Sequence, residues 1–171
     1  GRGSDGHELL FNPRQMRRLL PLLALGCTYS FGGFLPPSLR KAFVEELENS
    51  TPRQGLQVLV REELLRAIRE DGRLQLVGKP EAGLLVKGEV GSYDKRPEEY
   101  DQSGKILSYR VTVRVKLTFW DVAGDSAYLG PKLYSGFGIY NASGGSEDEA
   151  AREAVRAIAR QALGDLFTAG F

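Results

Sequence analysis

The sequence has almost none of the side chains that most enzymes use for nucleophilic or metal-assisted catalysis. Its 171 residues include one histidine, one cysteine and one methionine, which are His7, Cys27 and Met16. Residues 28–171 therefore cannot hold a Ser-His-Asp or Cys-His catalytic set, or a zinc site built from cysteine and histidine. A single cysteine also excludes a disulfide within one chain. Hydrolysis by carboxylates and metal sites built from oxygen ligands alone remain open. We nevertheless expect no catalytic residue, no metal site and no cofactor.

The sequence also lacks a surplus of positive charge. It has 23 Lys and Arg residues against 22 Asp and Glu residues, a formal net charge of +1. Residues 1–26 hold four Lys or Arg against two Asp or Glu, so the rest of the chain has a formal net charge of −1. Proteins that bind nucleic acid need clustered cationic residues to neutralise phosphates. We therefore expect no nucleic-acid partner.

The single cysteine follows a segment typical of export signals. Arg17 and Arg18 precede an apolar run, Leu19–Gly26, that ends directly before Cys27. The run is too short to span a bilayer, which takes about 20 residues, but a basic, apolar and small-residue order is typical of a lipoprotein signal. We expect residues 16–26 to be this signal and Cys27 to carry lipid. Alternatively, the run is part of the core and Cys27 is a small buried residue.

The remaining chain has the length and composition of one globular domain. Hydrophobic residues make up 42% and charged residues 26% of the sequence, which are ordinary values for a folded protein. Residues 1–15 contain no methionine and no apolar periodicity, and we interpret them as a cloning remnant or an upstream segment. Residues 27–171 are then the single domain.

Alternating apolar and polar residues predict the strands. The most regular pattern runs from Leu107 to Phe119, where every second residue is apolar. A period of two predicts a long antiparallel strand with one buried face and one solvated face. A turn at residues 121–125 leads to a partner strand, Tyr128–Tyr140. Shorter strands are predicted at residues 74–77 and 84–93.

Two other segments have helical periodicity. Residues 54–70 place apolar side chains on one stripe, and Asp71-Gly72 ends that helix with a left-handed glycine. The last helix begins near Glu147, after a capping box in which Ser146 and Glu149 satisfy each other's backbone amides. Residues 39–48 are ambiguous, although their local pattern favours a helix over a strand.

Together these elements predict an α+β two-layer sandwich. We expect a mostly antiparallel sheet of four to five strands with two helices packed on one face. In this arrangement Arg110, Arg114 and Lys116 share the uncovered face of the sheet. Tyr134 and Tyr140 on the neighbouring strand are expected to add aromatic surface to it. Such a face either docks a partner or simply faces water.

Two further groups of basic residues are candidate contacts for anions. The first group flanks the predicted hairpin loop: Lys95, Arg96 and Lys105. An arginine there can pair bidentately with a phosphate, unless the neighbouring carboxylates neutralise it. The second group recurs every fourth residue along the last helix: Arg152, Arg156 and Arg160. That line either meets an anionic surface or is a solvated face paired with glutamates of the same helix.

Two motifs have simpler explanations than phosphate binding or catalysis. Residues 143–146 precede a helix, as a phosphate cradle does, but the acidic residues 147–149 would repel an anion. Residues 98–101 include three carboxylates, Glu98, Glu99 and Asp101, which are the side chains available for general acid–base hydrolysis. No aromatic pattern typical of a substrate cleft surrounds them. We therefore expect the protein not to be an enzyme.

Two stretches resemble a known family. Cys27-Thr28-Tyr29-Ser30-Phe31 is followed by Leu35-Pro36-Pro37, and residues 93–101 have the pattern Tyr-x-x-Arg-Pro-x-x-Tyr-Asp directly before the long strand. Both resemble the LptE family of lipopolysaccharide-assembly lipoproteins, and the resemblance extends from Cys27 to about Leu166. It implies a strand, and not a helix, at residues 41–48.

The resemblance also implies a location, partners and contacts. LptE proteins are lipid-anchored at the periplasmic face of the outer membrane, where they plug the LptD β-barrel and help deliver lipopolysaccharide. The expected partners are an LptD-like barrel and lipopolysaccharide or a related glycolipid. Their candidate contacts are Lys95, Arg96, Lys105, Arg110, Arg114, Lys116, Arg152 and Arg156. The alternative is another periplasmic lipoprotein, with a TolB-N-terminal-like or CsgG-like module that binds proteins.

Overall fold

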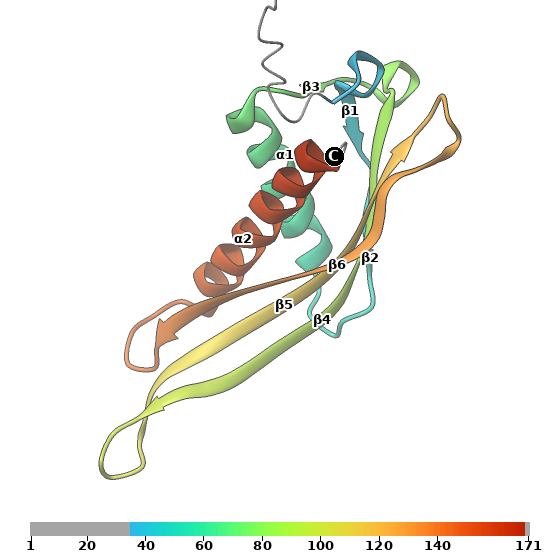
Figure 1. Cartoon of the computed structure of the whole chain (residues 1–171). Coiled ribbons are helices and arrows are strands. Elements are labelled where there is room, and N and C mark those ends of the chain that lie inside the picture. Colours follow the sequence, from blue (N-terminus) through green and yellow to red (C-terminus); the bar gives the residue numbers. More distant parts are fainter. Residues whose placement is uncertain (1–34, 170–171) are drawn as a thin grey trace, which may run out of the picture. The chain divides into compact units, whose positions relative to one another are not determined.

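The computed structural model describes residues 35–169, so Cys27, the signal-like segment and residues 1–15 lie outside the described part. The described elements follow one another along the chain as drawn in Figure 1. They are η1 (Pro37–Leu39), β1 (Lys41–Val44), β2 (Glu48–Asn49), α1 (Leu56–Asp71), β3 (Gln75–Leu76), η2 (Lys79–Glu81), β4 (Leu84–Tyr100), β5 (Ile106–Asp121), β6 (Ser126–Asn141) and α2 (Glu147–Thr168).

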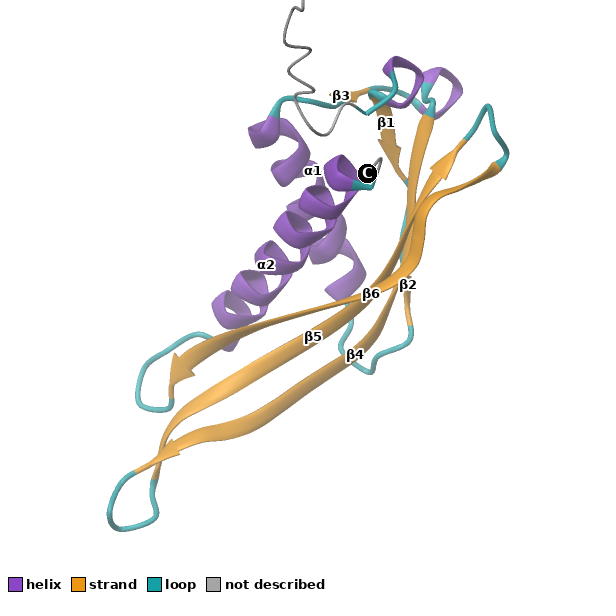
Figure 2. Cartoon of the chain, in the orientation of Figure 1, coloured by secondary structure: helices purple, strands orange, loops and turns teal. Residues whose placement is uncertain are grey.

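The strands form one six-stranded sheet in the order β3-β1-β4-β5-β6, with β2 pairing to β4 as well. Strands β4, β5 and β6 are antiparallel neighbours, because short turns join them directly. Strand β1 is parallel to both β3 and β4, because α1 lies between them in the sequence. Both helices lie on one side of the sheet (Figure 2). The predicted α+β sandwich is confirmed, and its sheet is mixed rather than purely antiparallel.

The alternation in β5 predicted the buried face correctly. Val111, Val113, Val115 and Leu117 are completely buried, and Arg114 and Lys116 are exposed. The helices supply the other side of the core with side chains at most 1% exposed: Leu64 and Ile68 of α1, and Val155 and Ile158 of α2. Leu107 continues the apolar pattern but is 46% exposed, because this end of the β4–β5 hairpin extends beyond the helices (Figure 1).

The structure corrects two local predictions. Residues 41–44 and 48–49 are strands, so the helix favoured by the local pattern at residues 39–48 is wrong and the strand implied by the family resemblance is right. Strand β4 continues to Tyr100, well past the predicted end at Tyr93. Residues 94–100 have little strand pattern of their own, but they pair with β5 as far as Ile106. Lys95 and Arg96 are therefore within a strand and do not flank the loop.

Helix α2 lies directly on β6. A Cβ atom built at Gly136 would be 2.0 Å from the carbonyl oxygen of Ala154, and one built at Gly138 would be 2.1 Å from the carbonyl oxygen of Ala150. Real Cβ contacts are never so short, so only glycine lets the two backbones approach this closely. These two glycines fix the position of α2 on the sheet.

The predicted cap forms in full at the end of α1 and in part at the start of α2. Gly72 has a φ of 75° and its N–H donates to the carbonyl of Ile68, as expected for a left-handed glycine after a helix. The Ser146 hydroxyl accepts a hydrogen bond from the N–H of Glu149, which is the first half of the predicted capping box. The second half does not form among the described residues, where the Glu149 carboxylate pairs with Arg156 and not with the N–H of Ser146. Neither described helix is long and apolar enough to cross a membrane.

Candidate functional site

The side of the sheet opposite the helices carries both cations and exposed apolar side chains. Arg110, Arg114 and Lys116 of β5 point to this side, and β6 adds Leu133, Phe137 and Ile139, which are 60%, 50% and 43% exposed. The β5–β6 register pairs Arg110 with Ile139 and Lys116 with Leu133, so a cationic row and an apolar row run side by side. We call these six residues the open face.

The predicted aromatic contribution of Tyr134 and Tyr140 to this face is wrong. The register places Tyr134 opposite Val115 and Tyr140 opposite Tyr109, whose side chains point towards the helices. Tyr134 is 3% exposed, and the Tyr140 ring stacks on Tyr109 with centroids 5.5 Å apart. The aromatic side chain on the open face is Phe137, with the Arg110 guanidinium 4.1 Å from its ring centroid.

The three cations of the open face differ in how far they are neutralised. Arg110 binds Glu98 through two hydrogen bonds of 2.7 and 2.5 Å, and this pairing lowers the pKa of Glu98. The Lys116 ammonium is 3.6 Å from a carboxylate oxygen of Glu89. Arg114 forms no ion pair within residues 35–169. The Arg114 guanidinium is therefore the group of this row most available to an anionic partner.

The predicted line of arginines on the last helix has a structural role that the sequence did not reveal. Arg152 and Arg156 of α2 bind the two carboxylate oxygens of Glu63 on α1, at 2.9 and 3.3 Å. Glu63 is 1% exposed, and a buried carboxylate left without these partners would be strongly destabilising. The two arginines therefore join the helices. Arg160, the third residue of the line, is exposed and has no ion-pair partner among the described residues.

Lys95 belongs to a polar cluster between the sheet and the start of α2. Its ammonium is 2.6 Å from Glu147 and 4.8 Å from the ring centroid of Tyr109. Glu147 also accepts hydrogen bonds from the Tyr93 hydroxyl at 2.6 Å and from Arg53 at 2.8 Å. Hydrogen bonds from Lys95 and then Tyr93 lower the pKa of Glu147 to about 2. Burial, and next the bond to Glu147, raises the pKa of Tyr93.

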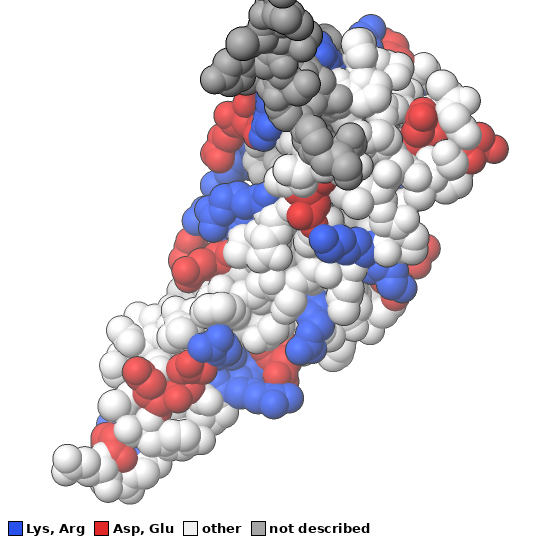
Figure 3. Space-filling model, in the orientation of Figure 1, with Lys and Arg blue, Asp and Glu red and all other residues white. Residues whose placement is uncertain are grey.

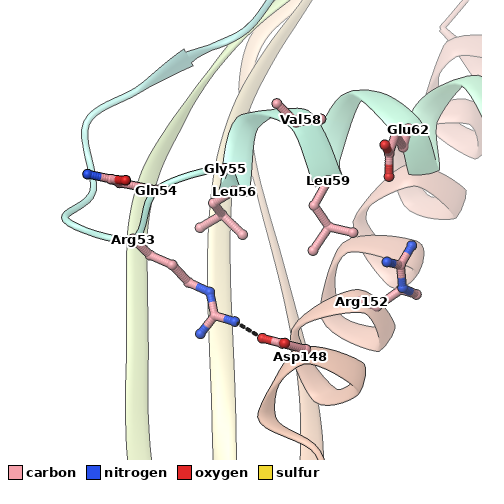
Figure 4. A pocket seen from close by; sticks show the side chains of 9 residues that line it. All are labelled: Arg53, Gln54, Gly55, Leu56, Val58, Leu59, Glu62, Asp148 and Arg152. Atoms are coloured by element: carbon pink, nitrogen blue, oxygen red, sulfur yellow. Dashed lines mark hydrogen bonds and ion pairs between the residues drawn. The ribbon is translucent and has the colours of Figure 1, made fainter.

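The cluster borders a shallow hollow of about 260 Å³ between the starts of the two helices. Figure 4 shows Arg53 reaching across it to Asp148, with which it forms an ion pair. Arg152 also lines the hollow, but its guanidinium is held by Glu63. The arginines here are thus already paired with carboxylates of the protein itself.

Arg96 and Lys105 lie on the hairpin that extends beyond the helices. Arg96 is paired with Asp94 at 2.7 Å, and its side chain is 78% exposed. Lys105 is exposed in the turn, where its backbone N–H donates to Asp101 at 2.9 Å. On the face seen in Figure 3, cationic and anionic side chains are interspersed and do not gather into one patch.

The clustered carboxylates of the hairpin are not arranged as an acid–base pair. Glu98 binds Arg110, Glu99 accepts a 3.2 Å hydrogen bond from Ser108, and Asp101 accepts the backbone amides of its own turn. A hydrogen bond from Ser103, and next the N–H of Lys105, lowers the pKa of Asp101. Residues 35–169 also contain no group of three His, Cys, Asp or Glu side chains that could hold a metal ion.

Comparison with known proteins identifies the family. The family LptE, described as lipopolysaccharide-assembly, matches residues 39–169, from η1 to the end of α2. This chain belongs to the LptE family. No curated protein sequence matches it. The resemblance inferred from residues 93–101 is thereby confirmed for nearly the whole described part of the chain.

Solved structures share the fold of this LptE-family chain at low sequence identity. A candidate lipoprotein from Caulobacter crescentus is 14% identical, with a TM-score of 0.51 over 72% of this chain and 88% of its own. A protein from Xanthomonas campestris is 12% identical, with a TM-score of 0.50 over 80% of this chain and 90% of its own. At these identities the likeness extends to the fold alone.

Proposed function

We propose that this protein is a lipid-anchored assembly factor at the periplasmic face of the outer membrane. It associates with an LptD-like β-barrel and assists the delivery of lipopolysaccharide or a related glycolipid to the cell surface, without catalysing a reaction. Membership of the LptE family supports the link to lipopolysaccharide assembly. The anchor in this proposal is Cys27, because two or more acyl chains are needed for stable membrane attachment and a processed lipoprotein cysteine carries them.

The open face is the observation that carries the proposal. Its two rows match the two chemistries that a glycolipid or the wall of a barrel presents: Arg114 offers an unpaired guanidinium for a phosphate or carboxylate, and Leu133 and Phe137 offer apolar surface. Exposed apolar side chains that are grouped and bordered by polar residues are typical of interaction surfaces. Among the described residues of the two helices, Val58 is the one large apolar side chain that is exposed, so the helix layer has no comparable apolar row.

Substitutions of open-face residues test the proposal. The tagged full-length protein is expressed with its native barrel, and capture of the barrel is measured for Arg114→Glu and Phe137→Ser. Both variants should fold, because both side chains are exposed, and both should capture less barrel than the wild type. Arg69→Glu is the matched control, since Arg69 is exposed on α1 and forms no ion pair among the described residues.

Binding of purified lipopolysaccharide distinguishes the two partners. If Arg114→Glu weakens lipopolysaccharide binding and leaves barrel capture intact, the open face serves the glycolipid. If barrel capture alone falls, it serves the barrel. If both variants behave like Arg69→Glu in both assays, the open face has no part in the function.

A further inference from the structure

Strand β6 ends the sheet and has one neighbour, β5. Its register with β5 is regular from Ser108–Asn141 to Leu117–Lys132. The N–H of Ala142 donates to the carbonyl of Leu107 at 2.9 Å, which fixes which residues of β6 bond to β5. Because hydrogen-bonded and non-bonded pairs alternate in an antiparallel ladder, the even-numbered residues of β6 bond to β5. The odd-numbered residues direct N–H and C=O to the free edge.

Three of these outward groups are occupied or absent, whereas among the described residues both outward groups of Phe137 and of Ile139 are free. The carbonyl of Ser135 accepts a hydrogen bond from Gln161 at 3.4 Å, the carbonyl of Asn141 accepts one from Gly145 at 2.9 Å, and Pro131 has no N–H. The outward N–H and C=O of Phe137 and Ile139 have no hydrogen-bond partner within residues 35–169. An edge segment of this kind is a template for pairing with another strand.

A hollow of about 270 Å³ lies beside this segment, between β6 and the first turns of α2. Ile139, Tyr140 and Asn141 line it from the strand, and Glu149 and Glu153 line it from the helix. Glu149 is engaged by Arg156 at 3.4 Å, whereas Glu153 is exposed and has no ion-pair partner among the described residues. The groove thus combines unpaired backbone groups with an available carboxylate.

We propose that the edge of β6 at residues 137–141 binds an extended segment of a partner polypeptide as an additional strand. Side chains of such a strand alternate between the two sides of the sheet. Those on one side lie beside Phe137 and Ile139 and are apolar, and those on the other side lie in the groove near Glu153 and are lysine or arginine. The partner segment therefore alternates apolar and basic residues.

The position of α2 favours a partner strand that has no helix packed against it on the α2 side of the sheet. Because the α2 backbone contacts Gly136 and Gly138, the helix lies directly above β6. A strand added at about 4.8 Å from β6 could not bring a covering helix of its own, because packed helices need about 8–10 Å between their axes. A second copy of this chain that placed its own α2 on the same side of the sheet is excluded for this reason. The wall of a closed barrel is excluded because it has no free strand edge.

The test uses the purified chain and a blocked ten-residue peptide of alternating valine and lysine as the probe. Binding should slow hydrogen exchange at the amides of Phe137 and Ile139. A matched peptide of alternating valine and glutamate should bind at least tenfold more weakly. N-methylation of one alternate set of peptide amides should abolish binding, and N-methylation of the other set should leave it intact. Equal binding of the lysine and glutamate peptides, or equal behaviour of the two N-methylated peptides, overturns the proposal.

Two variants test the protein side. Glu153→Lys should weaken binding of the valine–lysine peptide at least tenfold. Arg69→Glu should leave the affinity for this peptide unchanged. Ile139→Pro removes an N–H that β5 does not use, as Pro131 already does at an equivalent position of the same strand, and should abolish binding. Undiminished binding by Glu153→Lys overturns the proposed chemistry of the partner. If Ile139→Pro does not fold, the N-methylated peptides still test whether the peptide pairs with β6 as a strand.

Discussion

Adding one methyl group at Gly138 tests whether α2 rests on β6. A Cβ there would lie 2.1 Å from the carbonyl oxygen of Ala150, whereas ordinary contacts begin near 3.4 Å. In Gly138→Ala the helix must therefore retreat by about 1 Å, which loosens its buried side chains such as Val155 and Ile158. Overpacking of this kind costs about 1–3 kcal/mol, and the backbone-to-backbone overlap puts Gly138→Ala near 3 kcal/mol. At about 2–4 °C per kcal/mol for a chain of this size, Tm should fall by about 6–12 °C.

The same methyl group placed at Gly164 should have the opposite effect. Gly164 lies within α2, and a Cβ built there has nothing within 4 Å, so Gly164→Ala removes only the conformational freedom of glycine. That change stabilises a helix by about 0.5–1 kcal/mol and should raise Tm by about 1–4 °C. Thermal unfolding followed by circular dichroism measures both. A Tm for Gly138→Ala equal to or above that of the wild type would refute the contact, because alanine in a strand without a clash is itself stabilising.

Three further predictions concern the core, the polar cluster and the lipid anchor. Val113→Asp should prevent folding, since a buried unpaired carboxylate costs several kcal/mol, whereas Arg114→Glu should change stability by about 0.5 kcal/mol or less; equal melting temperatures would refute the burial assignment. The pKa of Glu147, lowered to about 2 from 4.5, implies stability that is present above pH 4.5 and lost as the pH falls towards 2. Glu147→Gln should flatten that pH dependence in thermal melts. Mass spectrometry of the native protein should find lipid on Cys27, and an unmodified thiol would contradict the proposed anchor.

The part of the fold that could be predicted from the sequence is the part in which burial dictates the pattern. The alternation in β5 is strict because one face meets the helices and the other does not. The side chains of β6 alternate in the same way, but here large apolar residues lie on the open side of the sheet and glycines lie on the core side. The core side of β6 carries Gly136 and Gly138, and its open side carries Leu133, Phe137 and Ile139. The close approach of α2 requires glycine on the inside, so hydrophobicity alone would place Leu133, Phe137 and Ile139 in the core. Tyr134 and Tyr140, which were expected on the open face, lie on the inside.

The candidate site was harder to predict because its charges are assigned by tertiary contacts. Arg152 and Arg156 have the spacing of a solvated helix face, and their partner Glu63 is far away in the sequence, on the buried stripe of α1. A carboxylate beside Val60 and Leu64 on that stripe was the one available signal. Lys95 was predicted beside a loop, because the strand that contains it is held by pairing with β5 and not by its own composition. Arg114 was placed correctly because its position depends on the alternation of β5 alone.

The parallel pairing of β1 has a consequence for the order in which the protein folds. β4, β5, β6 and α2 are contiguous in the sequence and make most of their contacts with one another, so they can assemble early at low loop-closure cost. β1 has no partner until β3 and β4 have been synthesised, because it pairs with both. In the proposed exported protein the chain also enters the periplasm from its N-terminal side, so residues 35–83 arrive before the meander that completes their sheet. During that interval Ala42 and Val44 of β1 and the apolar stripe of α1 are uncovered, and the chain is then most dependent on chaperones.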